Sequence, residues 1–188
     1  MVYRLLFPAL WIAFVVFWIV MARGGKTVAE RETLFSRVSH YGPLAVAVYL
    51  FVAPDSFAPI LNARFAPESL GLVQLGAALT IVGVAFAVWA RLRLAGNWSS
   101  DVTLKRDHEL VVDGPYRWVR HPIYTGVLLA LVGTGLAIGE WRAPVAVVLA
   151  GVAWWRKLTI EEIVMRRQFG DAYIRYAERT RGLIPFVL

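Results

Sequence analysis

The sequence predicts an all-α integral membrane protein with about five transmembrane helices. Apolar residues make up 59% of its 188 residues and the mean hydropathy is +0.58. Charged residues make up only 18%, against about 25% in soluble chains. Several apolar stretches approach the roughly 20 residues that a helix needs to cross a bilayer. These observations exclude an ordinary water-soluble domain.

The predicted spans differ in clarity. Residues 5–22 and 70–90 are long and uninterrupted, whereas residues 43–53 are short and run into Pro54. Residues 123–138 and 143–155 are joined by Gly-Glu-Trp-Arg, a sequence that favours a helical hairpin. Both arms are short for a hydrocarbon core, so a tilted hairpin or a locally thinned bilayer is expected.

The basic residues predict an orientation. Residues 23–40, 91–122 and 156–188 hold 17 of the 20 lysines and arginines. Cytoplasmic loops collect basic residues, so five spans would place the N-terminus outside and the C-terminus in the cytoplasm, in the inner or cytoplasmic membrane. Residues 5–22 could instead be a signal peptide. We expect a retained helix, because the stretch exceeds a typical apolar signal region of about 7–15 residues and charges follow it.

Composition also limits partners and cofactors. The chain has no cysteine, so disulfides and thiolate metal sites are excluded. Its three histidines, His40, His108 and His121, lack metal-ligand spacing, so we expect no metal. The net charge of +7 could suggest nucleic acid, but the segregation of charge favours the bilayer as the partner.

The polar connections contain further expected elements. Residues 102–112 alternate in character and predict a short hairpin or extended stretch before the turn at Asp113-Gly114-Pro115. Residues 159–168 should continue the last span as a helix that Gly170 interrupts. Phe169, Tyr173 and Tyr176 recur beyond it at helical spacing, which predicts a helical segment folded as a lid.

One polar segment stands at the start of the fourth span. Residues 114–126 read Gly-Pro-Tyr-Arg-Trp-Val-Arg-His-Pro-Ile-Tyr-Thr-Gly. Arginines and tryptophans at a membrane boundary are common, and that reading explains Arg117 and Trp118. It does not explain Tyr124 and Gly126, which lie inside the span, and dense polar clusters in a membrane usually have a function.

The remaining signature follows at the C-terminus. It consists of Glu161-Glu162, the Phe169-Gly170-x-x-Tyr173-x-x-Tyr176 pattern, and Leu183-Ile184-Pro185. Together with residues 114–126, it resembles the C-terminal half of membrane methyltransferases of the isoprenylcysteine carboxyl methyltransferase and phospholipid N-methyltransferase kind. The resemblance covers about residues 91–188. It implies one domain, residues 1–188, in which helices 1–90 support a cofactor-binding half, 91–188.

The resemblance implies S-adenosylmethionine as the cofactor, covered by the C-terminal helical segment. The implied cofactor-binding residues are Arg120, His121, Pro122, Tyr124, Gly126, Glu161 and Glu162. Adjacent helical residues point about 100° apart, so one glutamate is expected to face the cofactor while the other pairs with a cation.

Methyl transfer from a sulfonium mainly requires donor and acceptor to be held in line. We expect a lipophilic acceptor at the cytoplasmic face, entering from the bilayer between Trp89 and Trp154-Trp155. A carboxylate acceptor needs an orienting cation, for which Arg156 is the first candidate and Arg91 or Arg93 are others.

A thiol or amine acceptor needs a base, such as His121 or the glutamate pair. The sequence leaves O-, S- and N-methylation open. It also leaves two other functions: an NADPH-dependent membrane reductase of sterol-reductase-like architecture, and a non-catalytic scaffold or small transporter.

Overall fold

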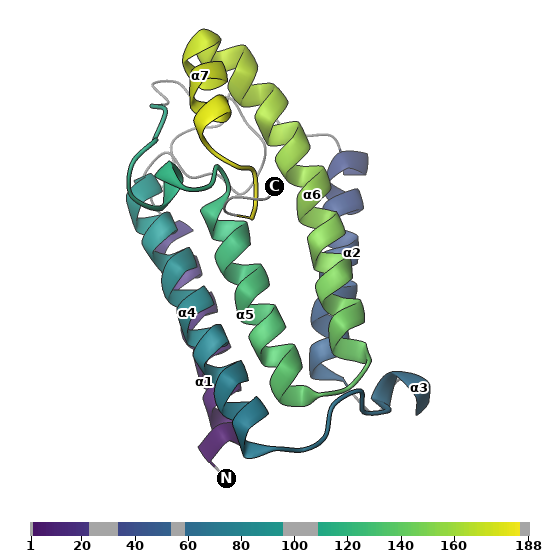
Figure 1. The fold of residues 1–188 in the computed structure, drawn as a ribbon. Coiled ribbons are helices and arrows are strands. Elements are labelled where there is room, and N and C mark those ends of the chain that lie inside the picture. The colour runs from purple at the N-terminus through teal and green to yellow at the C-terminus, as the bar shows by residue number, and fades with distance from the viewer. Residues whose placement is uncertain (1, 23–33, 54–58, 96–108, 185–188) are drawn as a thin grey trace.

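The computed structural model describes residues 2–22, 34–53, 59–95 and 109–184, and every regular element in them is helical. The helices run roughly alongside one another, with α5 between α4 and α6 and the short α7 at one end of the bundle (Figure 1). The elements are α1 (Val2–Ala22), α2 (Leu34–Val52), α3 (Pro59–Asn62), α4 (Leu70–Leu94), the 3-10 turn η3 (Gly114–Arg117), α5 (Pro122–Ile138), α6 (Arg142–Phe169) and α7 (Asp171–Arg179).

The predicted spans all lie within helices. Helix α4 begins where expected, because the Ser69 side chain accepts a hydrogen bond from the Leu72 amide and caps it. Helix α5 starts with Pro122, whose missing N–H matters little in a first turn. Helix α2 is longer than residues 43–53, because it continues through Pro43 back to Leu34.

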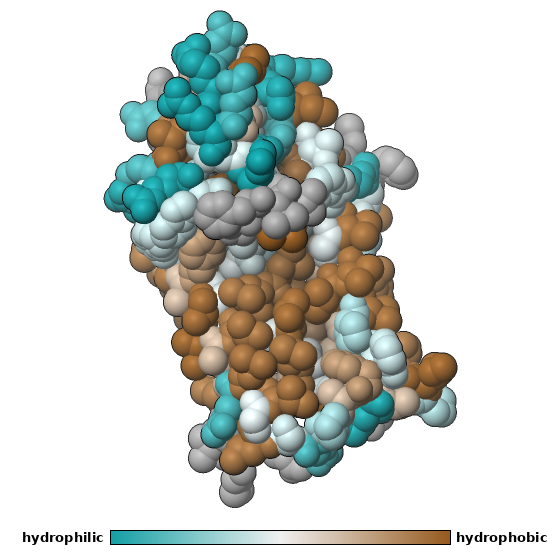
Figure 2. Space-filling model, viewed as in Figure 1, coloured by the Kyte–Doolittle hydropathy of each residue, from teal (hydrophilic) through white to brown (hydrophobic). Residues whose placement is uncertain are grey.

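The outer faces of the bundle are apolar. Large apolar side chains are exposed on α1, α2, α4 and α6; those on α1 include Leu5, Ile12 and Val16. Figure 2 shows a broad apolar band over the middle of one face of the bundle, while hydrophilic residues gather over α7 and the adjoining end of α6. A surface of this kind requires a hydrocarbon environment.

Three described helices are long and apolar enough to cross a membrane: Leu5–Ala22, Leu70–Leu94 and Arg142–Phe169. Two further apolar segments, Val38–Val52 and Pro122–Ile138, are shorter. The structure therefore indicates a helical integral membrane protein, and the five-span count stays a prediction.

Helices α4 and α5 pack antiparallel at backbone contact. A Cβ atom added to Gly83 would lie 2.4 Å from the Gly126 carbonyl oxygen, and one added to Gly76 would lie 2.4 Å from that of Gly133. Small residues allow such close approach in membranes, where packing replaces the hydrophobic effect. The four-residue spacing of Gly135-x-x-x-Gly139 in the sequence predicts a second close packing face. That expectation is wrong, because Gly139 ends α5 in the left-handed conformation at φ 69°.

A chain of polar side chains joins three helices inside the bundle. The Trp11 Nε1 donates to Thr134 Oγ1 at 3.1 Å, and the Thr134 and Thr80 hydroxyls lie 3.3 Å apart. Thr80 Oγ1 also donates to the carbonyl of Gly76, and Thr134 Oγ1 to that of Ala130. These hydrogen bonds tie α1 to the α4–α5 pair. They also satisfy the polar side chains of Trp11, Thr80 and Thr134 within the bundle.

Because α4 and α5 touch backbone to backbone, Gly83→Ala should destabilise the protein by about 1–3 kcal/mol. Gly151→Ala in α6 is the matched control, since nothing lies within 4 Å of its added Cβ. That variant should be neutral or gain about 0.5–1 kcal/mol from helix propensity. Thermal unfolding in detergent measures both, and equal melting temperatures for the two variants would contradict the close contact.

Candidate active site

His121 precedes α5 and lies between two carboxylates of α6. Its Nδ1 is 3.3 Å from Glu161 Oε2, and its Nε2 is 3.4 Å from Glu162 Oε1. The imidazole is only 9% exposed. The sequence predicted that the two glutamates would point apart, but the structure brings both to one histidine because the ring spans the angle between them.

This environment changes the titration of the histidine. Burial alone lowers the pKa of His121, but the hydrogen bonds and negative charges of Glu161 and Glu162 outweigh it and raise that pKa above its ordinary value. The two carboxylates therefore favour the imidazolium over the neutral ring.

Arg120 connects three segments. Its Nε donates to Glu162 Oε1 at 2.7 Å, and its Nη1 donates to the carbonyl oxygens of Ala177 and Thr180 at 3.1 and 2.6 Å. Those carbonyls belong to the end of α7, where helix carbonyls lack intrahelical partners and favour a cation. The Arg120 guanidinium thus binds the Glu162 carboxylate of α6 and also caps the C-terminal end of α7.

Tyr124 extends the cluster one turn into α5. Its hydroxyl donates to Glu161 Oε1 at 2.7 Å. Its ring stacks on His121 on one side and on Trp154 of α6 on the other, with centroids 5.7 Å apart in both pairs and planes within 7° and 11°. The three-ring stack fixes Tyr124 between α5 and α6.

The chain after α7 returns to the start of α5. The amides of Arg120 and His121 donate to the carbonyls of Arg181 and Gly182 at 2.7 and 3.0 Å, and Thr125 Oγ1 donates to that of Leu183. Tyr176 donates to the carbonyl of Tyr116 at 2.7 Å, and Tyr173 is buried. The aromatic stripe therefore docks α7 against the body of the protein.

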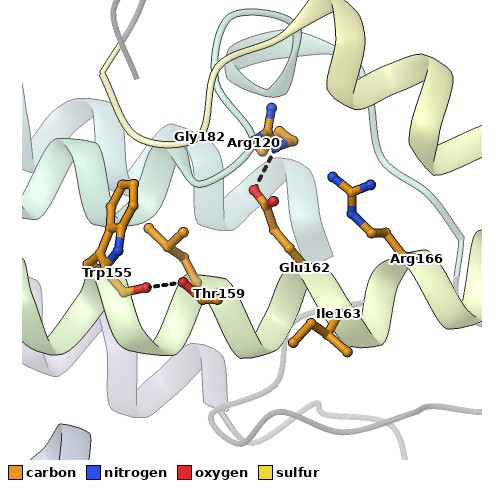
Figure 3. A pocket seen from close by; sticks show the side chains of 8 residues that line it. Arg120, Trp155, Thr159, Glu162, Ile163, Arg166 and Gly182 are labelled. Atoms are coloured by element: carbon orange, nitrogen blue, oxygen red, sulfur yellow. Dashed lines mark hydrogen bonds and ion pairs between the residues drawn. The ribbon is translucent and has the colours of Figure 1, made fainter.

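A cavity of about 280 Å³ lies beside this cluster. Trp155, Thr159, Glu162 and Arg166 line it from one face of α6, spaced by four, three and four residues. Arg120 and Gly182 also line it, and Figure 3 shows Arg120 and Glu162 pointing toward one another and joined by their hydrogen bond. The other lining residues are Leu158 and Ile163.

Two of the predicted cofactor residues serve packing. Gly126 faces α4, where an added Cβ would lie 2.6 Å from the Gly83 carbonyl oxygen, and Pro122 is fully buried at the start of α5. Arg91 is also buried, donating to the carbonyls of Met21 and Ala95, while Arg93 pairs with Asp113.

The structure separates other predicted residues from the cavity. Arg156 is not among the residues that line it, and Trp89 packs on Phe86 and Trp118 instead. Trp155 does line the cavity and Trp154 belongs to the stack. The short hairpin or extended stretch predicted at residues 102–112 lies largely outside the described residues. Its described part, residues 109–112, forms no strand.

Sequence reasoning missed Thr159 and Arg166 as lining residues. Their helical spacing from Glu162 was the available signal. The backbone contacts of residues 181–183 had no such signal, because main-chain groups are the same in every sequence.

Comparison with known proteins decides the family. The phospholipid methyltransferase family profile matches residues 72–172, which run from α4 to the first residues of α7. The chain belongs to the phospholipid methyltransferase family. The match includes His121 and both glutamates, so the cluster lies within the family's shared region.

Relatives of this phospholipid methyltransferase family member are named as methyltransferases. Protein-S-isoprenylcysteine O-methyltransferase B of Arabidopsis thaliana is 26% identical, over 89% of this chain and 84% of the relative. The Schizosaccharomyces pombe protein-S-isoprenylcysteine O-methyltransferase is 33% identical, over 52% of this chain but only 43% of the relative.

A solved structure agrees with the fold. The eukaryotic intramembrane Ras methyltransferase, isoprenylcysteine carboxyl methyltransferase, superposes with a TM-score of 0.55 and 25% identity. The match covers 81% of this chain and 52% of that one, so this family member spans about half the length of the solved relative.

Proposed function

We propose that this protein transfers a methyl group from S-adenosylmethionine to a lipophilic acceptor at the membrane. The observation that carries the proposal is the grouping of His121, Glu161 and Glu162 beside a cavity. The family supports methyl transfer, and the apolar surface supports an acceptor that resides in the bilayer.

The described residues fit the donor chemically. A carboxylate accepts hydrogen bonds from ribose hydroxyls and from an ammonium group, and Glu162 presents one to the cavity. His121 Nε2 is buried 3.4 Å from Glu162 Oε1, so the imidazole and this carboxylate form one polar group beside the cavity. The residues that would hold adenosylmethionine are Arg120, His121, Tyr124, Glu161 and Glu162, with Pro122 and Gly126 setting the α5 backbone.

The protein's own contribution is positioning and exclusion of water. Bound adenosylmethionine would supply a methyl group already activated on sulfur. Arg120 and the 181–183 segment hold the cavity wall in place through their hydrogen bonds. The stack of His121, Tyr124 and Trp154 keeps the α5–α6 contact fixed.

The state of His121 favours a carboxylate acceptor. The two carboxylates beside His121 raise its pKa, which disfavours the neutral ring that a general base for a thiol or an amine requires. A carboxylate is already ionised at neutral pH. Its methylation forms one C–O bond, breaks one C–S bond, leaves the electron pair on sulfur and releases no proton. We infer O-methylation, with a cation orienting the acceptor; Arg156 is the cation proposed from sequence.

We also propose five spans with the N-terminus outside and the C-terminus in the cytoplasm. The support is the 17-to-3 distribution of basic residues and the hydrophilic end of the bundle at α7. Reporter fusions after Gly25 and at Leu188 should both report the cytoplasm, and a luminal or periplasmic signal at Leu188 would overturn the orientation.

Calorimetric titration of the purified protein in detergent tests the cofactor. We expect saturable binding of adenosylmethionine and none of NADPH. Binding of NADPH alone would favour the reductase, and binding of neither would favour a non-catalytic membrane protein.

A further inference from the structure

A group of aromatic and basic side chains lies where η3 packs beside the end of α4 (Figure 1). The Trp118 ring centroid is 5.7 Å from that of Trp89 and 6.3 Å from that of Phe86, with the planes at 72° and 15°. The guanidinium carbon of Arg117 lies 4.9 Å from the centroid of the Trp118 ring. These four residues form the boundary cluster. Both tryptophans and Arg117 are exposed, so the cluster is open to whatever surrounds the bundle.

The boundary cluster stands between the apolar layer and the polar end of the bundle. One face of α4 carries, at spacings of four, three and four residues, Val82, Phe86, Trp89 and Arg93. This face changes from aliphatic through aromatic to cationic toward the C-terminal end of a helix that is long enough to cross a membrane. Indole rings favour the headgroup level, and guanidinium groups bind phosphate. The order along α4 therefore matches that of a phospholipid, with the acyl chain first and the phosphate last.

The uncompensated positive charge of this surface belongs to Arg117. Arg93 forms an exposed ion pair with Asp113, which neutralises it. Arg117 instead lies over Trp118, and an aromatic face attracts a cation without neutralising its charge. The Arg117 guanidinium is therefore held in place while it keeps N–H donors for an anion.

The boundary cluster is separate from the candidate active site. None of its four residues is among the described residues that line the cavity. Along the chain, the fully buried Val119 and Arg120 stand between Trp118 and His121. A ligand at the boundary cluster is therefore distinct from the cofactor and the acceptor of the proposed reaction.

We propose that the boundary cluster binds one anionic phospholipid. Arg117 donates hydrogen bonds to the lipid phosphate, the Trp89 and Trp118 rings pack against the glycerol region, and Phe86 contacts an acyl chain. A zwitterionic lipid binds less well, because its choline ammonium meets the guanidinium as a like charge. The inference goes beyond methyl transfer and does not depend on it. The competing explanation is that the rings only hold the protein at headgroup depth in any lipid.

Native mass spectrometry of the full chain in detergent tests this site, with phosphatidylglycerol and phosphatidylcholine of identical acyl chains as the probes. The unaltered protein should bind its first phosphatidylglycerol about tenfold more tightly than its first phosphatidylcholine. Arg117→Gln should remove that preference, and Arg117→Lys, which keeps the charge, should retain it. Arg175→Gln, an equal loss of charge at an exposed position of α7, should also retain it. Phosphatidylglycerol carries no amine, so its binding is not that of an N-methyl acceptor.

Three results would overturn the inference. Equal binding of the two lipids by the unaltered protein would reduce the boundary cluster to a depth anchor. Equal losses of preference in Arg117→Gln and Arg175→Gln would indicate general attraction to a basic protein. Displacement of the lipid by inorganic phosphate at the same concentration would show that the rings and the acyl chain contribute nothing. Thermal unfolding of each variant in detergent establishes that the compared proteins are folded.

Discussion

Replacing Glu162 with glutamine should weaken adenosylmethionine binding by about 10- to 100-fold. The substitution keeps the size of the side chain but removes the charge that Arg120 and His121 both face. It also removes the carboxylate that lines the cavity, so a ligand ammonium or ribose hydroxyl would lose its strongest acceptor.

His121→Ala should have a comparable effect by a different route. It removes the buried ring that spans both glutamates, so Glu161 keeps only the Tyr124 hydroxyl and Glu162 only Arg120 among the contacts described above. Breaking a buried ion pair costs about 3–5 kcal/mol of stability in other proteins, so thermal unfolding must accompany the titration. Glu68→Gln is the control, because Glu68 forms an exposed ion pair with Arg64, and neither residue belongs to the His121 cluster.

Calorimetry on each folded variant measures the result. If Glu162→Gln and His121→Ala both bind adenosylmethionine as tightly as the unaltered protein, the cluster has no part in cofactor binding. The family membership would then describe the fold of this chain and not its cofactor site.

Acceptors with long apolar tails should be methylated with a kcat/KM at least about a hundredfold higher than short ones. Each buried CH₂ group contributes about 0.8 kcal/mol, so a farnesyl tail supplies enough binding free energy several times over. The exposed apolar surface and the cavity-lining Trp155, which is 51% exposed, support access from the bilayer.

A panel with labelled adenosylmethionine measures this preference. It should include prenylated thiols, isoprenoid acids, aminophospholipids and a short water-soluble thiol. Equal or better turnover of the short thiol would reject entry from the bilayer and point to a small-molecule S-methyltransferase.

Local chemistry explains which helices could be predicted. The start of α4 followed from the apolar run that begins at residue 70, and the structure adds the Ser69 side chain that caps the helix there. The start of α2 did not, because Pro43 looked like a boundary and only tertiary packing reveals that the helix continues through it. The close-packing glycines were misassigned, because the four-residue spacing singles out Gly135 and Gly139, whereas α4 contacts Gly126 and Gly133, which are seven residues apart.

The candidate site was partly predictable for the same reason. His121, Tyr124, Glu161 and Glu162 could be picked out from the sequence because they match the pattern of a known family. That the histidine reaches both carboxylates depends on how α5 meets α6, which no local pattern encodes.

The backbone contacts between residues 119–121 and 181–182 have a consequence for biosynthesis. Arg120 and Thr180, which one hydrogen bond joins, are 60 positions apart in the chain. During translation, Arg120 and His121 are synthesised well before Arg181 and Gly182, whose carbonyl oxygens accept hydrogen bonds from their amides. When α5 and α6 are made, this end is therefore still open, and residues 181–182, which are synthesised later, complete the wall of the cavity.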